Sequence, residues 1–178
     1  MFKKLRGDIG CILERDPAAR TWWEVLTCYP GLHAIYIHKL ARWFWLNNLR
    51  WLGRLASQLG RWLTGIEIHP GAKIGCCVFI DHGMGVVIGE TAVIGERVRL
   101  YQAVTLGARS FPVGPDGELQ KGNARHPIVE DDVVIYAGAT ILGRVTIGRG
   151  SVIGGNVWLT RSVPPGSHVT QAQSQHEA

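Results

Sequence analysis

The sequence predicts an α+β protein: an N-terminal α-helical region followed by a left-handed parallel β-helix. Two periodicities lead to this prediction. Apolar residues recur at helical spacing from Cys11 to Gly65, and beyond Gly65 aliphatic residues return at every sixth position. We therefore expect a helical region over residues 1–66, a β-helix over 67–166 that is interrupted by an excursion loop at 108–127, and a flexible tail over 167–178.

Proline residues mark the breaks inside the helical region. Asp16 followed by Pro17 is typical of a helix N-cap with proline at the first helical position. Pro30-Gly31 indicates a break before the next helix. Six of the seven tryptophans lie in this region, and their helical spacing favours a packing role over a cofactor-binding role.

The hexads predict the coils of the β-helix. A short strand places one aliphatic side chain inward, and glycine or another small residue then turns the corner of a triangular coil. Three hexads complete a coil, and stacked coils share one aliphatic core that the helical region can cap at one end. The expected inward positions are Ile68, Ile74, Ile80, Ile88, Ile94, Leu100, Leu106, Val129, Ile135, Ile141, Ile147, Ile153 and Leu159.

Two interruptions of the hexads are candidate ligand-binding segments. The first is Asp81-His82-Gly83-Met84-Gly85, and the second is Ala108 to Pro127, which is rich in glycine, proline and charge. Insertions in a solenoid leave the coil as loops on one face, and such a face often binds ligand.

Charge and cysteine content narrow the function classes. The net charge is +5, and the basic excess lies in residues 1–66, which hold ten Lys and Arg against four Asp and Glu. A solvated helix face explains this most simply, although an acidic partner, a membrane surface or nucleic acid stays open. We find no nucleic-acid motif, no signal peptide and no run of roughly 20 apolar residues. We expect a cytoplasmic protein without nucleic-acid or membrane partners.

The four cysteines have neither CxxC nor zinc-type spacing, which predicts no metal site and no disulfide.

Several stretches resemble one enzyme family. They are Ile68-His69-Pro70, Ile80-Asp81-His82-Gly83-Met84-Gly85, Ile88-Gly89-Glu90-Thr91 and Tyr101-Gln102-Ala103-Val104-Thr105-Leu106-Gly107. With Arg125-His126-Pro127 and Asp16-Pro17, they are similar to serine O-acetyltransferases over roughly residues 11–166. The hexads alone indicate only the wider hexapeptide-repeat acyltransferases, whereas the Asp-His-Gly-Met-Gly and Arg-His-Pro motifs narrow the acceptor to serine.

The resemblance implies transfer of acetyl from acetyl-coenzyme A to the hydroxyl of L-serine, the first step of cysteine biosynthesis. A serine hydroxyl is a poor nucleophile at neutral pH until a base removes its proton during attack on the thioester. By resemblance His82 is that base, Glu67 stands where the family has the aspartate behind it, and His126 lies near the reacting hydroxyl.

The resemblance also implies how zwitterionic serine is held. Arg125 is expected to bind its carboxylate, Asp16 and Asp81 its ammonium group, and Glu90 joins this serine-binding group. Each residue also has a simpler interpretation: Asp16 as a helix N-cap, His82 as a turn residue beside glycines, His126 as a surface residue before proline, and Glu90 as a solvated side chain.

Coenzyme A is expected on the coil surface between two subunits, without any metal. The residues implied by the resemblance are Gly107, Ala108, Ala137, Gly138 and Gly155. Ala108-Arg109 replaces the glycine and threonine usual in the family, so the first contacts with the coenzyme are expected to differ.

The family's assembly implies a homotrimer. Relatives with a longer helical domain pair two trimers, so the short helical region here makes a hexamer the less expected state. Cysteine resembles serine closely and is expected to inhibit competitively. The ending Gln175-His176-Glu177-Ala178 lacks the isoleucine by which some relatives dock into the enzyme that consumes O-acetylserine, which predicts no such complex. Three alternatives stay open: another small hydroxyl or amine acceptor, a non-catalytic trimeric scaffold, and a β-helix carbonic anhydrase with zinc held by three histidines.

Overall fold

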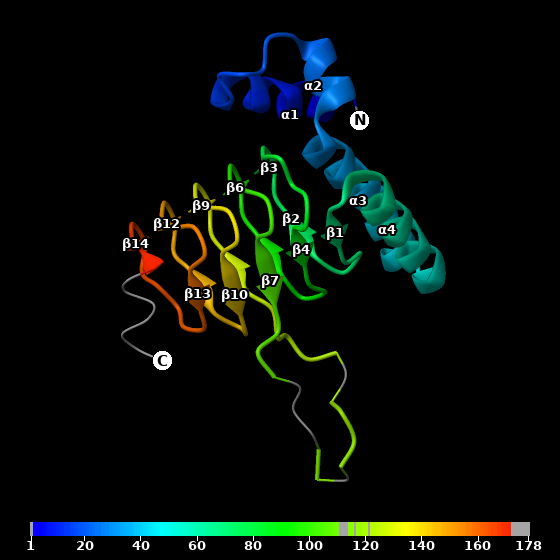
Figure 1. Cartoon of the computed structure of the whole chain (residues 1–178). Coiled ribbons are helices and arrows are strands. Elements are labelled where there is room, and N and C mark those ends of the chain that lie inside the picture. The colour runs from blue at the N-terminus through cyan, green and yellow to red at the C-terminus, as the bar shows by residue number, and fades with distance from the viewer. Residues whose placement is uncertain (1, 111–113, 116, 121, 172–178) are drawn as a thin grey trace.

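Helices come first and a β-helix follows, as the periodicities predict (Figure 1). The structure is a computed structural model and describes residues 2–110, 114–115, 117–120 and 122–171. The tail residues from which we predicted no docking complex therefore lie outside the described residues. The helices are α1 (Phe2–Arg15), α2 (Trp22–Cys28), α3 (Pro30–Leu46) and α4 (Arg50–Thr64).

The helix boundaries confirm one of the two proline predictions. Pro30 occupies the first turn of α3, as expected. Asp16 does not cap a helix, so that prediction is wrong: its Oδ1 accepts a hydrogen bond from the Ala18 backbone N–H at 2.9 Å. The N-cap of α2 is Thr21, whose hydroxyl oxygen accepts from the Glu24 N–H. Aspartate often closes such a local turn in competition with a helix start.

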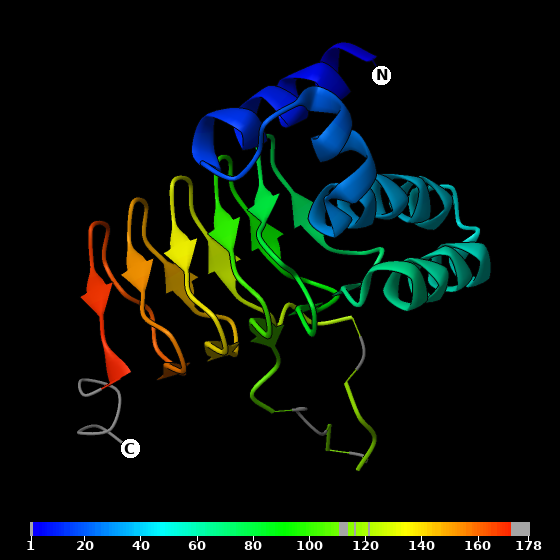
Figure 2. The same cartoon turned by 45° about the horizontal axis from the view of Figure 1, so that its top comes forward.

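The strands stack in three parallel sheets. Their orders are β1-β4-β7-β10-β13, β11-β8-β5-β2 and β14-β12-β9-β6-β3. Figure 2 shows the coils stacked in chain order, from green beside the helices to red at the far end. The strands are β1 (Glu67–Ile68), β2 (Lys73–Ile74), β3 (Phe79–Ile80), β4 (Val87–Ile88), β5 (Val93–Ile94), β6 (Arg99–Leu100), β7 (Thr105–Gly107), β8 (Ile128–Val129), β9 (Val134–Ile135), β10 (Thr140–Leu142), β11 (Thr146–Ile147), β12 (Val152–Ile153), β13 (Trp158–Leu159) and β14 (His168–Val169).

The hexads form the core as predicted. Every expected inward residue is buried except Ile74, which is half-buried in the first coil. Along one sheet Ile68 pairs with Ile88, and Ile88 with Leu106. A second inward position, four residues after the first, was not predicted. It is filled by small residues such as Ala72, Ala92, Val98, Val104, Val133, Ala139 and Val157.

The helical region caps the first coil through small residues. An added Cβ on Gly31 of α3 would lie 2.0 Å from the Ile80 carbonyl oxygen, so only glycine permits this approach. Helix α4 turns Gly53, Ser57, Gly60 and Thr64 toward the molecule, and the Ser57 hydroxyl donates to the Ile68 carbonyl.

The apolar face of α4 points away from the molecule. This face, which we name the outer face of α4, consists of Trp51, Leu52, Leu55, Leu59, Trp62 and Leu63, all exposed. Trp62 is 82% exposed, and Trp22, Trp23 and Trp43 are also exposed. Trp45 is half-buried and its ring packs edge-on against His69, whereas the other five tryptophans of the helical region do not pack into the core of this single chain.

A disulfide joins α1 to the first coil, which corrects the prediction of none. Cys11 and Cys77 are bonded, with Cα atoms 5.7 Å apart. The two cysteines are 66 residues apart in the sequence and come together only in the folded chain, so their spacing did not predict the bond. Cys28 and Cys76 are free and exposed.

The excursion leaves the β-helix between β7 and β8, as expected (Figure 1). Strand β14 pairs with β12, so regular structure continues beyond the boundary expected at residue 166. Within the described residues, no helix is long and apolar enough to cross a membrane.

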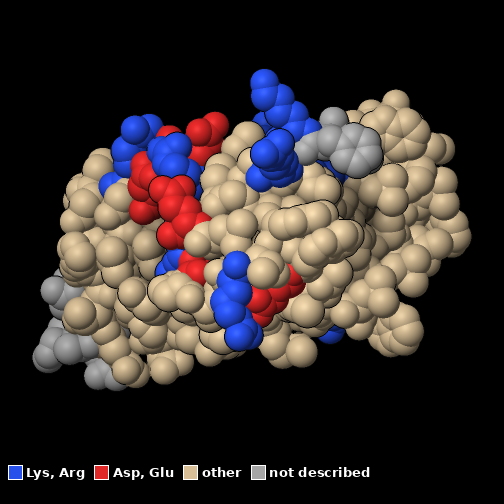
Figure 3. All heavy atoms as spheres, turned by 90° about the horizontal axis from the view of Figure 1, so that it is seen from above, with Lys and Arg blue, Asp and Glu red and all other residues tan. Residues whose placement is uncertain are grey.

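Acidic and basic side chains stand together on the face seen from above (Figure 3). Ion pairs on the described corners include Arg97 with Asp132 and Arg149 with Asp131. Ion pairs at the surface contribute little to stability, so these pairs do not hold the coils together.

Candidate active site

Most predicted site residues lie on two edges of the β-helix, separated by the sheet β1-β4-β7-β10-β13. Asp16 lies between α1 and α2, and Glu67 lies in β1. We name the first edge the first ridge: it consists of the turns 81–86, 101–104, 136–139 and 154–157. The second ridge consists of the turns 89–92 and 143–145, with the excursion 108–127 between them.

The first ridge begins with the turn from Asp81 to Gly85. His82 has φ 60°, and Gly83 and Gly85 have φ 81° and 76°, so the chain follows a left-handed path that glycine tolerates best. An added Cβ on Gly83 would lie 2.5 Å from Ile66 Cδ1, so this glycine also allows close packing. The turn pushes the His82 side chain outward, where it is 71% exposed.

One carboxylate lies beside His82, and a second lies close enough to the first to interact with it. Asp81 Oδ1 is 3.8 Å from His82 Nε2. Burial raises the pKa of the Asp81 carboxyl and the Asp16 carboxylate raises it further, whereas His82 and Arg99 lower it. Asp16 Oδ2 accepts a hydrogen bond from the Tyr29 hydroxyl at 2.7 Å. The fold thus brings Asp16, Asp81 and His82 together, and a cation placed there would relieve the repulsion of the two acids.

Glu67 faces a different partner. Its Oε2 lies 3.2 Å from Arg61 Nη1 at the end of α4. No bond between Glu67 and His82 is found among the described residues, so the expected pair of the two is not formed in this chain. Asp81 is the acid nearest to the His82 imidazole.

The second ridge brings Glu90, Arg125 and His126 together. Arg125 Nη2 donates to Glu90 Oε2 at 2.7 Å, and both side chains are about three-quarters buried. Glu90 therefore orients the guanidinium, and is not the solvated side chain of the simpler interpretation. Arg144 Nη1 donates to the carbonyls of Thr91 and His126 and so fastens the segment that carries them.

His126 is buried, with 7% exposed surface, and so is not a surface loop residue. Burial and then the Arg125 charge lower the pKa of His126 to about 4. Its Nδ1 lies 2.9 Å from Thr91 Oγ1 and accepts from the Thr91 N–H at 3.1 Å. The ring lies against Gly89, where an added Cβ would be 1.9 Å from His126 Cδ2.

The residues expected at the coenzyme divide between the same two ridges. Ala137, Gly138 and Gly155 lie on the first ridge, on neighbouring coils, and the Ala137 carbonyl accepts from the Asn156 N–H. Gly138 has φ 72°, and an added Cβ would lie 2.2 Å from Asn156 Oδ1. Gly107 and Ala108 lie where the excursion of the second ridge begins.

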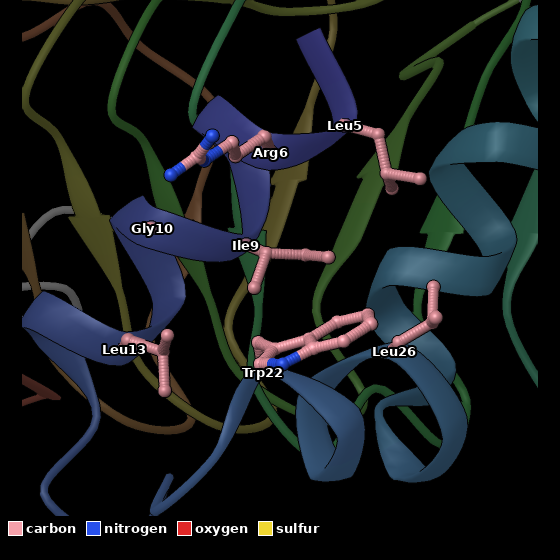
Figure 4. A pocket seen from close by; sticks show the side chains of 7 residues that line it. All are labelled: Leu5, Arg6, Ile9, Gly10, Leu13, Trp22 and Leu26. Carbon is pink, nitrogen blue, oxygen red and sulfur yellow. The ribbon is translucent and has the colours of Figure 1, made fainter. Parts of the chain in front are cut away.

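The structure has a hollow on the second ridge and a larger one in the helical region. One, of about 290 Å³, is lined on the second ridge by Glu90, Thr91, Ala124 and Arg144. A larger one, of about 580 Å³, lies between α1 and α2 and is lined mainly by apolar side chains (Figure 4). It contains none of the predicted site residues. No group of three or more metal-binding side chains occurs in the described part of the chain.

Sequence reasoning missed three residues of this site. Gly89 makes room for the His126 ring, Thr91 binds that ring, and Tyr29 binds Asp16. Gly89 and Thr91 stand in a quoted motif, but their role depends on a segment 35 residues away along the chain. Tyr29 has no sequence signal.

Known proteins resemble this chain in sequence. The family described as bacterial transferase hexapeptide (six repeats) matches residues 126–161. A plasmid-encoded serine acetyltransferase of Synechococcus elongatus is 61% identical over 95% of this chain and 53% of its own length. A serine acetyltransferase of Mycobacterium tuberculosis is 49% identical over 98% of this chain and 72% of its own length. The chain thus spans about half the length of the first of these relatives.

Solved structures resemble it in fold. Serine acetyltransferase isoform 3 of Entamoeba histolytica, in complex with cysteine, has a TM-score of 0.84 and 41% identity, covering 94% of this chain and 57% of that one. The Neisseria gonorrhoeae serine acetyltransferase in complex with serine has a TM-score of 0.85 and 33% identity, covering 95% and 66%. The Brucella abortus serine acetyltransferase in complex with coenzyme A has a TM-score of 0.84 and 32% identity, covering 94% and 63%. The predicted left-handed β-helix behind N-terminal helices is thereby confirmed.

Proposed function

The chain belongs to the serine acetyltransferase family, and on that premise we propose that it transfers the acetyl group of acetyl-coenzyme A to the hydroxyl of L-serine. The products are O-acetyl-L-serine and coenzyme A, as in the first step of cysteine biosynthesis. The observation that supports this most directly is the grouping of a histidine with two acids on one ridge, and of an arginine with a second histidine on the other.

The chemistry is a direct transfer. His82 removes the proton of the serine hydroxyl while the serine oxygen attacks the thioester carbon. The bond from carbon to sulfur then breaks, and the His82 imidazolium gives the proton that it took from serine to the thiolate of coenzyme A. The Asp81 carboxylate, 3.8 Å from His82 Nε2, favours the imidazolium that forms in between.

Charge complementarity supports the binding of serine. The Arg125 guanidinium, oriented by Glu90, suits a carboxylate. Asp16 and Asp81 suit an ammonium group, and its charge would lower the raised pKa of the Asp81 carboxyl. Acetyl-coenzyme A would follow the small residues Ala137, Gly138 and Gly155 on one ridge and Gly107 and Ala108 on the other.

A homotrimer would complete the site. Within one chain a whole sheet separates His82 from Arg125, so one chain alone cannot hold one serine molecule with both. In a closed threefold assembly every contact joins one surface of a chain to a different surface of its neighbour, which allows the first ridge to face the second. The outer face of α4 supports such an assembly, because exposed tryptophan and leucine of this extent mark an interface.

The first experiment measures thiol release from acetyl-coenzyme A with and without L-serine. We expect serine-dependent release that falls by roughly 10² to 10⁴ fold in His82→Ala, the loss typical of a general base. An unchanged rate in folded His82→Ala would refute its role as base. Release with homoserine or another small acceptor, but not with serine, would refute the substrate assignment.

Mixed trimers test the shared site. His82→Ala and Arg125→Ala are each expected to be inactive, but the Arg125→Ala chain keeps its first ridge and the His82→Ala chain keeps its second. If neighbouring chains share each site, an active site needs an Arg125→Ala chain on its first-ridge side and a His82→Ala chain on its second-ridge side. Trimers assembled at random from equal amounts of the two variants should therefore contain about a quarter of the wild-type number of active sites. Refolded mixtures that contain trimers yet show no activity would contradict the shared site.

Two further proposals follow from the same site. Cysteine carries the same carboxylate and ammonium as serine, so we expect inhibition that is competitive with serine, which a cysteine titration at several serine concentrations measures. Because acetyl-coenzyme A is consumed, we also propose a cytoplasmic location, which fractionation of cells expressing the chain checks.

A further inference from the structure

Thr91 has a complete set of hydrogen bonds around its hydroxyl. The backbone N–H groups of Arg125 and His126 donate to Thr91 Oγ1 at 2.9 and 3.1 Å. His126 Nδ1 lies 2.9 Å from the same oxygen. A hydroxyl offers two lone pairs and one proton. Because the two N–H groups use the lone pairs, the Thr91 O–H donates to His126 Nδ1.

A second donor reaches the same nitrogen. The Thr91 backbone N–H donates to His126 Nδ1 at 3.1 Å. Since a backbone N–H can only donate, Nδ1 accepts and carries no proton. The neutral ring then has its proton on Nε2. Nε2 faces Gly89, where an added Cβ would lie 2.2 Å from it, and no described residue accepts a hydrogen bond from it. Its proton is therefore not used by the described residues.

We propose that Thr91 is a positioning residue that holds His126 as a neutral hydrogen-bond donor through Nε2. His126 then donates to the thioester oxygen as it becomes negative, while His82 alone acts as base. The donation by His126 to the thioester oxygen rests on the proposed acetyl transfer, whereas the assignment of the tautomer does not. A preorganised donor of this kind is typically worth roughly 10² to 10³ in kcat.

The groups around His126 favour the neutral ring. Arg125 and Arg144 oppose a positive charge on it, Glu90 favours one, and His69 lies close enough to interact electrostatically. Burial is the largest contribution, and the pKa of His126 is lowered to about 4. Near neutral pH the ring can therefore donate without first gaining a proton.

The tautomer is read from imidazole nitrogen shifts in the full chain labelled with ¹⁵N-histidine, with His126→Gln to assign the signals. We expect an unprotonated Nδ1 and a protonated Nε2 from pH 6 to 8. Thr91→Ser keeps the hydroxyl and should keep this pattern. Thr91→Val keeps the Thr91 backbone N–H but removes the acceptor of the Arg125 and His126 N–H groups, so the ring should shift away from the Thr91 N–H and populate the second tautomer. A wild-type ring with its proton on Nδ1, or wild-type shifts in Thr91→Val, would overturn the proposal.

Kinetics give an independent readout. We expect kcat to fall about tenfold or more in Thr91→Val with little change in KM for acetyl-coenzyme A, and to stay within about threefold in Thr91→Ser. Thr146→Val is the matched control, because no hydrogen bond of the Thr146 side chain is found in the described part of the chain. His126→Gln can donate but cannot act as a base, so it should retain more activity than His126→Ala. Equal loss in these two variants would count against a donor role. Absence of acetyl transfer by the wild type would defeat the proposed function alone, because the nitrogen shifts would still decide the tautomer.

Discussion

Replacing Gly89 by alanine should displace the His126 ring. The added Cβ would lie 1.9 Å from His126 Cδ2 and 2.2 Å from Nε2. Carbon atoms in contact need about 3.5 Å, so the ring must retreat by roughly 1.5 Å. Gly89 is not among the glycines with positive φ, so alanine fits its backbone and the clash is the main effect.

A displacement of this size is costly for catalysis. Misplacing a reacting or donating group by about 1 Å can lower the rate by roughly 10² fold. We therefore expect kcat for thiol release to fall about a hundredfold in Gly89→Ala, while the assembly and the circular dichroism spectrum stay unchanged. Gly10→Ala is the control, because nothing lies within 4 Å of its added Cβ. Wild-type kcat in folded Gly89→Ala would refute the need for His126 at this position.

Glu67→Gln should lose only a partly exposed ion pair with Arg61 and change kcat by less than about threefold, whereas Asp81→Asn should lower kcat at least tenfold. If steady-state assays show Glu67→Gln as impaired as His82→Ala, Glu67 supports the base after all. Cys11→Ser should lower the free energy of unfolding by up to about 4 kcal/mol, because the disulfide closes a loop of 66 residues. Urea unfolding measures this, with Cys28→Ser as the control; equal midpoints would contradict it. Burial lowers the pKa of His38 from 6.5 to about 4, so between these values the unfolded chain binds a proton that the folded chain does not. Stability should be complete above about pH 6.5 and fall as the pH decreases toward 4, and this dependence should weaken in His38→Leu; identical urea profiles for the two chains would count against it.

The sequence alone predicted the β-helix because the hexad is a local signal. The direction of each aliphatic side chain at the first inward position is set within its own short strand, and the same pattern repeats in every coil. The excursion and the turn at His82 were also visible, as interruptions of the period. The residue types of the site came from the resemblance of short motifs.

Contacts between distant segments were decided by the tertiary structure. Thr91 meets His126 across 35 residues because the excursion returns to the same corner of the next coil, and Cys11 meets Cys77 because α1 lies against the first coil. The apolar residues of α4 predicted a helix correctly, but only packing showed that its small residues face inward and its tryptophans outward. Periodicity depends on neighbours along the chain, whereas the pairing of Glu90 with Arg125 and the separation of the two ridges depend on how whole coils stack.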